Sequence, residues 1–524
     1  MEKKKAKLFS AIALVALALL VVGATYAYFQ NQYGSASNAD VKVTTYTTDV
    51  LTFETGDAIN ISADQDTFAE GKGNQTGSTF ARATLQANNK TNTATANYYM
   101  YLNIENNTFT YTKSGTPELI LQVVDKTSGN PVTSITGLNY VTVTDGKNTS
   151  ISGFDITNKD GLIALFLNKE ISASPKTVEE YTITITLVNH NFDQNVNTGK
   201  NLNGKLIIQK EKMITSISDV AKSGDALATV LETLGTKGDS SLTGLYHHDA
   251  NLTNGAEDNS YRFAGADPNN YVCFGSDDAT CPVDNLYRII GVIDGKVKLI
   301  HAYGATTDML GTDEGYANTY QAAWGSISSY YKENGDLTKI GTYKWNKTYD
   351  NTWSTSTTNT TNLNNNFLTY LDGKNAKWKT MIADTTWYVG GMTSTNGYKS
   401  NAKTAYTYEV GVNKDATTVN AKIGLMYLSE YYYGATPDYW MLQGFRYDNA
   451  TNDNWLYTGL YEWTISRDSD ASDGAFAVRA GGDLIINPVD YSDGAAVRPS
   501  FSLSPSIKFT SGEGTAVNPI RIKL

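Results

Sequence analysis

Short runs of β-type residues recur along the first part of the chain, and turn-forming residues separate them. In the clearest run, apolar side chains occupy every second position from 98 to 104. A period of two places these side chains on one face of an extended strand. Similar runs lie at 118–124, 162–167, 181–188 and 205–209, bounded by Gly, Asn, Asp or Pro. Many short strands with turn-rich joints predict an all-β sandwich, of jelly-roll or immunoglobulin-like type, over residues 28–211.

The composition favours the same class of structure. The chain has 35 Tyr and 44 Gly, and only 18% of its residues are charged. Tyr, Thr and Val suit a half-buried sheet, whereas Gly, Asn and Asp supply turns. The formal net charge of −11 argues against a nucleic acid partner, because a phosphate backbone needs a basic face.

The first residues predict export. Four lysines among residues 3–7 precede an uncharged run from Leu8 to Phe29. This order is typical of a secretory signal, and Thr25 and Ala27 provide the small residues for cleavage after Ala27. The run is also long enough to span a bilayer, so an uncleaved anchor over residues 1–27 is the alternative. We therefore expect an exported protein, at the cell surface or extracellular, that meets a membrane only through this segment.

The pattern changes after residue 211. Apolar residues at 220, 227, 230, 231 and 234 share one helical face behind Ser218 or Asp219, which predicts a helical connector over 212–243. A second domain then covers 244–524. Its strands are expected at 287–293, 297–300 and 421–428, and its helices around 363–371 and 376–382, so its class is α+β. Residues 351–362, rich in Thr and Asn, are expected to form a surface loop before an Asn-capped helix.

The two cysteines, Cys273 and Cys281, lie close together in an exported chain. An oxidising exterior favours a disulfide between them, and Gly275 permits the tight turn that such a small loop needs. Two free thiols are the alternative. A zinc site would need further Cys or His residues nearby, and the sequence provides none.

The N-terminal segment Val22-Gly-Ala-Thr-Tyr-Ala-Tyr-Phe29, followed by a β-rich domain, resembles the export region of TasA/camelysin-type surface and biofilm-matrix proteins. This resemblance implies a jelly-roll-like domain and self-assembly into fibres by strand donation. An added strand would satisfy the open edge of a sandwich.

The C-terminal domain resembles C-type-lectin-like bacterial surface domains with the fold of the sulfatase-modifying enzymes. Three segments carry the resemblance: Gly459–Thr464, the stretch from Gly474 to Gly482, and Ala496-Val-Arg-Pro-Ser-Phe501. It implies a stable scaffold with variable late loops. The formylglycine-generating members use cysteine chemistry, but Cys273 and Cys281 lie far upstream of the matching segments. The enzymatic function is therefore not expected here.

Two late loops are the candidate ligand-binding site, and their polar residues are Asp468, Asp470, Asp473, Asp490, Tyr491 and Asp493. The first three carboxylates share one turn, which raises calcium as an alternative to a plain solvated turn. However, Asp473 stands where an EF-hand loop needs Gly, and Arg479 where it needs Glu. We therefore expect no metal and no other cofactor.

Aromatic residues precede these loops, at 440, 455, 457, 461 and 463, and exposed rings of this kind would suit sugar stacking. We instead expect Trp463 to belong to the core, as the resemblance implies. The four histidines are too scattered for a catalytic or metal cluster. The sequence has no Gly-x-Ser-x-Gly elbow, no His-Glu-x-x-His motif and no phosphate-binding glycine loop.

These observations predict an adhesin-like protein of the bacterial cell surface rather than an enzyme. A β-sandwich stalk would present a lectin-like domain to a glycan or a surface protein. The alternatives are a structural subunit of a biofilm matrix or fibre and, after it, an enzyme that acts on polysaccharide. The sequence does not identify the ligand.

Overall fold

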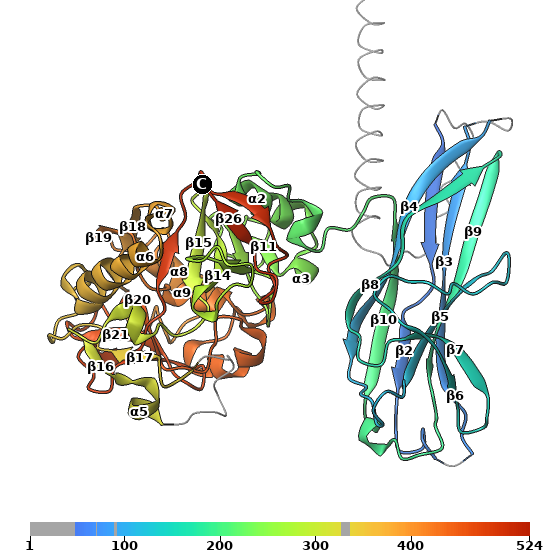
Figure 1. Ribbon diagram of the computed structural model, residues 1–524, viewed down its shortest axis with the longest axis horizontal. Helices are drawn as coiled ribbons and strands as arrows, with labels where there is room; N and C mark the ends of the chain where they lie inside the picture. The colour runs from blue at the N-terminus through green and yellow to red at the C-terminus, as the bar shows by residue number, and fades with distance from the viewer. Residues whose placement is uncertain (1–47, 70, 89–91, 326–335) are drawn as a thin grey trace, which may run out of the picture. The chain divides into compact units, whose positions relative to one another are not determined.

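The structure is a computed structural model that describes residues 48–69, 71–88, 92–325 and 336–524. The predicted signal or anchor, residues 1–27, lies outside this part of the chain. None of the described helices is long and apolar enough to cross a membrane. The chain divides into two compact units after Met213 and is a β-rich multidomain protein (Figure 1).

The N-terminal unit contains two antiparallel sheets with a common core. One has the order β1-β3-β9-β5-β7-β6 and the other β2-β10-β4-β8. The strands are β1 (Val50–Thr55), β2 (Ile59–Ser62), β3 (Gln75–Gln86), β4 (Ala94–Asn107), β5 (Leu119–Asp125), β6 (Tyr140–Thr144), β7 (Ser150–Asp155), β8 (Gly161–Ala173), β9 (Lys176–Leu187) and β10 (Asn201–Gln209), with one short helix, η1 (Asn195–Asn197).

The predicted strands of this unit are present because their alternating apolar residues have a core to face. Leu102 and Ile104 of β4 pack with Leu121 of β5 and Ile183 of β9 in one cluster of buried side chains. Asn103 of β4 and Thr182 of β9, which alternate with these apolar residues, are only partly buried. The sandwich-like arrangement of two sheets is therefore confirmed.

The C-terminal unit is built on two larger sheets and two strand pairs. The first sheet has the order β11-β12-β14-β15-β24, with β13 also paired to β14, and the second the order β16-β17-β23-β20-β21-β22. Their strands are β11 (Leu245–His247), β12 (Tyr261–Phe263), β13 (Tyr271–Cys273), β14 (Leu286–Ile293), β15 (Lys296–His301), β16 (Tyr316–Thr319), β17 (Gly341–Tyr343), β20 (Glu462–Arg467), β21 (Gly474–Val478), β22 (Leu484–Pro488), β23 (Ala495–Ala496) and β24 (Ser500–Ser502). The pairs are β18 (Thr385–Tyr388) with β19 (Thr418–Ala421) and β25 (Lys508–Ser511) with β26 (Arg521–Lys523).

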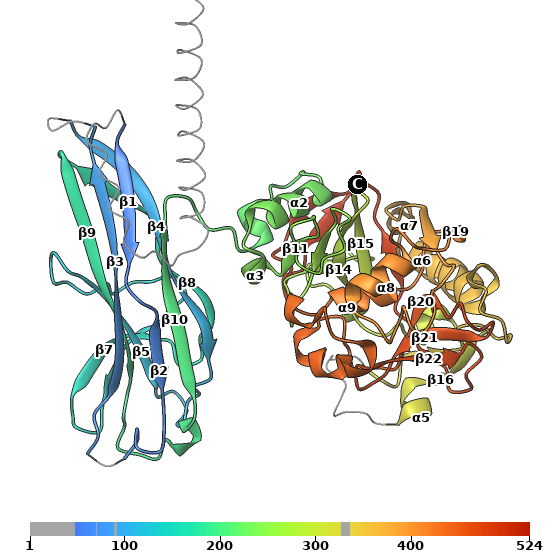
Figure 2. The ribbon, with the colours of Figure 1, turned by 180° about the vertical axis from the view of Figure 1, so that it is seen from behind.

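Short helices surround these sheets, and Figure 2 shows α8 and α9 side by side. The α-helices are α2 (Leu227–Lys237), α3 (Ser240–Thr243), α4 (Thr307–Leu310), α5 (Tyr320–Trp324), α6 (Leu368–Lys374), α7 (Ala376–Thr380), α8 (Ala402–Glu409) and α9 (Leu428–Tyr433). The other helices are η2 (Ile217–Asp219), η3 (Val283–Asn285), η4 (Trp353–Thr355), η6 (Pro437–Tyr439), η7 (Gly444–Asp453) and the π-helix η5 (Thr358–Phe367).

The helix predicted in the connector is part of the C-terminal unit. Helix α2 begins at Leu227 and continues through Gly235 to Lys237. Leu231 and Leu234 are buried in the same core as the strands of the first sheet. The capping residue ahead of η2 is Ser216, whose side chain shares a capping box with Asp219. Residues 214–243 thus form no separate connector, because the apolar face of α2 packs against the core of the C-terminal unit.

Two further predictions for this unit were wrong. Only residue 421 of the predicted strand 421–428 belongs to a strand, and Leu428 begins helix α9. Residues 351–362 are not a surface loop, since Asn351 and Trp353 are each only 1% exposed and η5 begins at Thr358. Their polar side chains bond to buried backbone groups, which lets a segment of polar composition lie inside the fold.

The predicted disulfide is confirmed. Cys273 and Cys281 are bonded, with their Cα atoms 5.8 Å apart. Gly275 within the loop has a φ of +95°, and a side chain there would meet the carboxamide of Asn285. The bond therefore closes a turn that depends on glycine at this position.

Candidate functional site

A pocket of the C-terminal unit lies where the π-helix η5, helix α6 and the turn after α4 come together. Asn362 and Asn366 of η5 donate hydrogen bonds from their Nδ2 atoms to the carbonyl oxygen of Leu310, at 3.0 and 2.8 Å. These bonds satisfy a carbonyl group at the end of α4, which has no partner within the helix. The π-helix thereby holds the turn in place.

Gly311 gives this turn its shape. Its φ is +76°, and a Cβ atom there would lie 2.5 Å from both Asn366 Nδ2 and Asp313 Oδ1. Asn366 donates a hydrogen bond to Asp313 at 2.9 Å, and the hydroxyl of Tyr343 donates to the Gly311 carbonyl at 2.8 Å. The close approach of the carboxamide and the carboxylate thus requires glycine between them.

The pocket has a volume of about 420 Å³. It is lined by Asp308, Met309, Gly311, Asp313, Asn365, Asn366, Thr369 and Tyr370. Within the described residues, Asp308 and Thr369 make no side-chain hydrogen bond, so their oxygen atoms are available to a ligand. The lining thus combines carboxylate acceptors, carboxamide groups, a hydroxyl and one aromatic ring.

The ring of Tyr370 is partly buried at the edge of this pocket. It stacks against Phe367 with the ring centroids 6.4 Å apart, and the Lys374 ammonium lies 5.2 Å from its centroid. Burial raises the pKa of Tyr370 to about 12, and the nearby carboxylates of Asp284 and Asp308 add to this shift. The Tyr370 hydroxyl therefore remains a hydrogen-bond donor at neutral pH.

The aspartates predicted from the sequence do not line this pocket. The side chain of Asp468 is buried, and burial raises its pKa, with Asp470 and Asp473 contributing as neighbouring charges. Asp470 is exposed, and its backbone N–H donates to Asp468 Oδ1 at 3.0 Å. Asp468 therefore stabilises its own turn instead of facing a ligand.

The buried side chain of Asn351 organises the turn from Asp468 to Gly474. Its Nδ2 atom lies 2.8 Å from the carbonyl oxygens of Asp468, Ala471 and Gly474. These carbonyls accept from a carboxamide, whereas a calcium loop turns such oxygens toward the ion. No three acidic, His or Cys side chains of the described chain gather in a group that could hold a metal ion. The calcium alternative gains no support from this arrangement.

The second predicted loop lies beside the first. The backbone N–H of Val489 donates to the carbonyl of Asp473 at 2.8 Å. The exposed Tyr349 hydrogen-bonds to Asp473, which raises the pKa of that phenol, with Asp490 a further charge nearby. The structure therefore brings Asp473 and Asp490 together around a tyrosine that the sequence analysis missed.

Tyr491 and Asp493 complete that loop. Tyr491 stacks on Trp324, and Trp324 stacks on Tyr461 at a centroid distance of 4.6 Å. Asp493 is exposed in the turn before Gly494. Tyr491 is thus engaged in packing, and Asp493 faces solvent.

The aromatic residues considered for sugar stacking are buried in the core. Trp440 and Trp463 have no exposed surface, Trp455 is 2% exposed, and Tyr457 and Tyr461 are nearly as buried. The indole nitrogen of Trp463 donates to the Tyr343 carbonyl at 2.7 Å. The expectation that Trp463 lies in the core is confirmed, and none of the five offers an open ring face.

The histidines serve packing as well. His247 stacks on Tyr261, and His248 is enclosed by Tyr433 and Trp440. Both ring nitrogens of the buried His301 face backbone carbonyls, and the buried His190 contacts the carbonyl of Pro117. Neither His nor Cys lines the pocket at Tyr370.

Comparison with known proteins adds little to this geometry. No family model matches the chain, and no curated protein matches it. A chain from a structure of the Streptococcus pneumoniae β-galactosidase BgaA covers 30% of this chain and 99% of its own length, at 10% sequence identity and a TM-score of 0.12. A TM-score this low carries no argument about fold or function.

Proposed function

We propose that this protein is an exported, surface-associated bacterial binding protein, and that its C-terminal unit recognises a glycan in the pocket at Tyr370. The observation that carries the proposal is the lining of the pocket. Two carboxylates, two carboxamides, a threonine hydroxyl and a tyrosine ring line an open hollow of about 420 Å³. A sugar presents hydroxyl groups and an apolar ring face, and this combination of groups can bind both.

We propose binding as the role of this site. The pocket contains neither His, Cys nor Ser, but it does contain two carboxylates, Asp308 and Asp313. Because glycoside hydrolysis uses a pair of carboxylates, an enzyme that acts on polysaccharide is the alternative. Asn366 and Asp313 are held in place by hydrogen bonds at the turn after α4, whereas Asp308 and Thr369 are available to a ligand.

We propose a jelly-roll or immunoglobulin-like topology for the N-terminal sandwich and a C-type-lectin-like fold for the C-terminal unit. Export through residues 1–27 and display at the cell surface belong to the same proposal, as does self-assembly through the N-terminal unit. The net charge of −11 still argues against a nucleic acid ligand.

An array of host and bacterial glycans, incubated with the whole chain from residue 28, tests this function. We expect saturable binding to at least one glycan. Tyr370→Ala and Asn366→Ala should each weaken that binding about tenfold, as expected for the loss of one stacking or hydrogen-bond contact. Tyr408→Ala is the matched control, because Tyr408 is an exposed tyrosine on a different helix, α8.

Two outcomes would contradict the proposal. One is the absence of binding to every glycan by a folded chain. The other is binding that Tyr370→Ala and Asn366→Ala leave unchanged, which would place the ligand elsewhere.

A further inference from the structure

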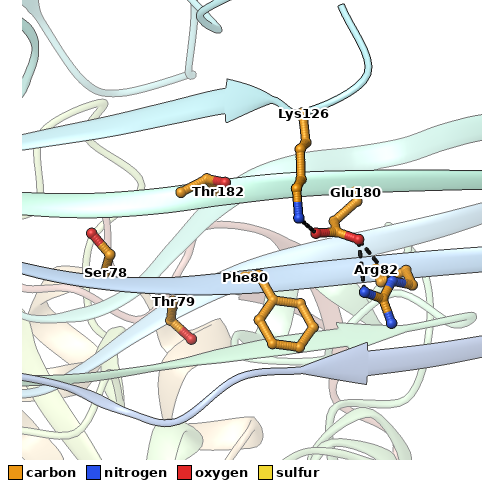
Figure 3. Close-up of a pocket in the computed structure, with 7 residues that line it drawn as sticks. All are labelled: Ser78, Thr79, Phe80, Arg82, Lys126, Glu180 and Thr182. Atoms are coloured by element: carbon orange, nitrogen blue, oxygen red, sulfur yellow. Dashed lines mark hydrogen bonds and ion pairs between the residues drawn. The ribbon is translucent and has the colours of Figure 1, made fainter. Parts of the chain in front are cut away.

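The N-terminal unit has a hollow of its own on the outer face of its six-stranded sheet (Figure 3). Its volume is about 320 Å³. The lining residues are Ser78, Thr79, Phe80 and Arg82 of β3, Glu180 and Thr182 of β9, and Lys126, which follows β5. All of them belong to one unit.

The alternation of β3 explains why these side chains are available. Thr79, Ala81 and Ala83 are buried toward the core, whereas Ser78 is exposed and Phe80 and Arg82 are partly exposed on the opposite face. Figure 3 shows the side chain of Thr79 pointing away from Ser78 and Thr182. A large aromatic ring on a solvent-facing strand position costs hydrophobic free energy, because part of its apolar surface stays in water.

Ion pairs fix the charged side of the hollow. Glu180 accepts hydrogen bonds from Lys126 Nζ at 2.5 Å and from Arg82 Nε at 2.8 Å, and Arg82 also pairs with Glu54. The Arg82 guanidinium carbon lies 5.3 Å from the centre of the Phe80 ring. Two cations and two carboxylates thus balance each other, and several of their donors and acceptors stay at the surface.

Hydroxyl groups form the other side. The hydroxyl groups of Ser78 on β3 and Thr184 on β9 share a hydrogen bond of 2.8 Å. Thr182, two residues before Thr184, lies on the same face of β9. Groups of this kind both donate and accept hydrogen bonds. They match the hydroxyl groups of a sugar without favouring a charged ligand.

Beside the hollow, β3 pairs with β9, and β9 pairs with β5 beyond it. Strand β1 pairs with β3 only over residues 81–86, and the N–H of Gly56 donates to the Phe80 carbonyl at 2.9 Å. The side chains on the outer face of β3 and β9 are the groups that line the hollow.

We propose that this hollow is a second binding site, which takes a neutral polysaccharide. Phe80 contacts an apolar face of a sugar ring, while Glu180, Arg82 and the hydroxyl side bond to its hydroxyl groups. The balance of charges selects a neutral chain over an acidic one. The site is independent of the pocket at Tyr370.

Affinity electrophoresis of the whole chain from residue 28 tests this site, with gels that contain soluble β-glucan, xylan, galactomannan or dextran, and polygalacturonate as an acidic probe. We expect retardation by at least one neutral polysaccharide. Phe80→Ser should weaken that binding about tenfold, and Tyr370→Ala should leave it unchanged. Tyr99→Ser is the matched control, because Tyr99 is a partly exposed aromatic residue of β4 in the other sheet.

Three outcomes would overturn the proposal: retardation by no neutral polysaccharide, retardation by polygalacturonate alone, or equal loss in Phe80→Ser and Tyr99→Ser. Circular dichroism of each variant establishes that the fold is intact. If Tyr370→Ala abolishes binding to the glycan array while Phe80→Ser has no effect in the gels, the function proposed for the C-terminal unit stands and the second site falls.

Discussion

At the scale of single residues, buried polar side chains decide how the loops of the C-terminal unit are held. Asn351 is 1% exposed and connects three carbonyls of the turn 468–474 to the segment before η4. Asn364 of η5 forms a similar connection, since it donates to the carbonyl of Ile423 and accepts from the N–H of the same residue. A buried or half-buried carboxamide can thus satisfy backbone groups in segments that lack a partner strand.

Removal of the Asn351 carboxamide should therefore loosen the aspartate turn. We expect Asn351→Ala to lower the free energy of unfolding of the C-terminal unit by about 1–3 kcal/mol, since buried carbonyls lose their donor. Urea denaturation measures the change, and limited proteolysis should show new cleavage within 468–474. Asn413→Ala, at an exposed asparagine, should have almost no effect. An unchanged unfolding midpoint for Asn351→Ala would show that the turn 468–474 is stable without the Asn351 carboxamide.

His248 should make stability depend on pH. Its Nδ1 atom accepts a hydrogen bond from the N–H of Ala256 at 3.0 Å, so the neutral ring carries its proton on Nε2. Burial, with the charge of Arg262 as the next cause, holds the pKa of His248 well below its usual value. The unfolded chain binds a proton at about pH 6.5, but the folded chain does not. His248 therefore does not lower the free energy of unfolding above about pH 6.5. As the pH falls below this value, protonation of His248 in the unfolded chain favours unfolding.

The comparison of the natural chain with His248→Gln measures this effect. Between pH 6 and pH 5, the free energy of unfolding of the natural chain should fall by up to about 1.4 kcal/mol per pH unit more than that of the variant. Chemical denaturation at a series of pH values gives both slopes. Parallel slopes would mean that His248 is protonated in the folded state.

At the scale of elements, the short loop closed by Cys273–Cys281 follows strand β13 directly. Strand β13 has only three residues and pairs with β14. Inside the loop, the carbonyl of Ala279 accepts a hydrogen bond of 2.9 Å from Arg521 of β26, a strand at the other end of the unit's sequence. The bond between the cysteines thus limits the freedom of a strand too short to be stable alone.

Loss of this bond should destabilise the C-terminal unit. For a closed loop of this length, we expect the double variant Cys273→Ser, Cys281→Ser to have a free energy of unfolding about 2–3 kcal/mol lower than that of the natural chain. Guanidinium denaturation measures the difference, and addition of a reductant to the natural chain should reproduce it. If the reduced chain kept its midpoint, the bond would be absent or without effect on stability.

At the scale of the whole molecule, the two units have separate cores. The cluster that contains Leu102 and Ile183 and the cluster that contains Leu231 and Trp463 share no residue. Separate cores are the physical basis for independent folding of domains. The boundary between Met213 and Ile214 divides the chain without dividing either core.

Each unit should therefore fold by itself. We expect fragments 48–213 and 214–524 to unfold cooperatively, each with about the midpoint of the matching transition in the whole chain, measured by circular dichroism. A fragment that starts at 244 should be less stable than 214–524, because it lacks Leu227, Leu231 and Leu234 of α2. Equal stability of these two fragments would contradict the place of α2 in the core.

The sequence by itself determined the features that depend on neighbours in the chain. The alternation at 98–104 predicted a strand because each residue of a strand faces opposite to the one before it. Cys273 and Cys281 predicted a disulfide because they are the two cysteines of the sequence, lie eight positions apart and belong to a chain that is expected to be exported. The division into a β-rich part and a mixed part followed from the same local patterns.

Only the tertiary structure decided which polar and aromatic residues face solvent. Asn366 and Leu310 are 56 positions apart, and no local pattern predicts that a carboxamide of η5 closes the turn at Gly311. The pocket at Tyr370 was missed for this reason, although the run of asparagines before it was visible in the sequence. The aspartates at 468–473 were read as a ligand loop, but a distant residue, Asn351, holds the carbonyls of their turn inside the fold. Burial and hydrogen bonding depend on what packs against a segment, and that partner lies far away in the chain.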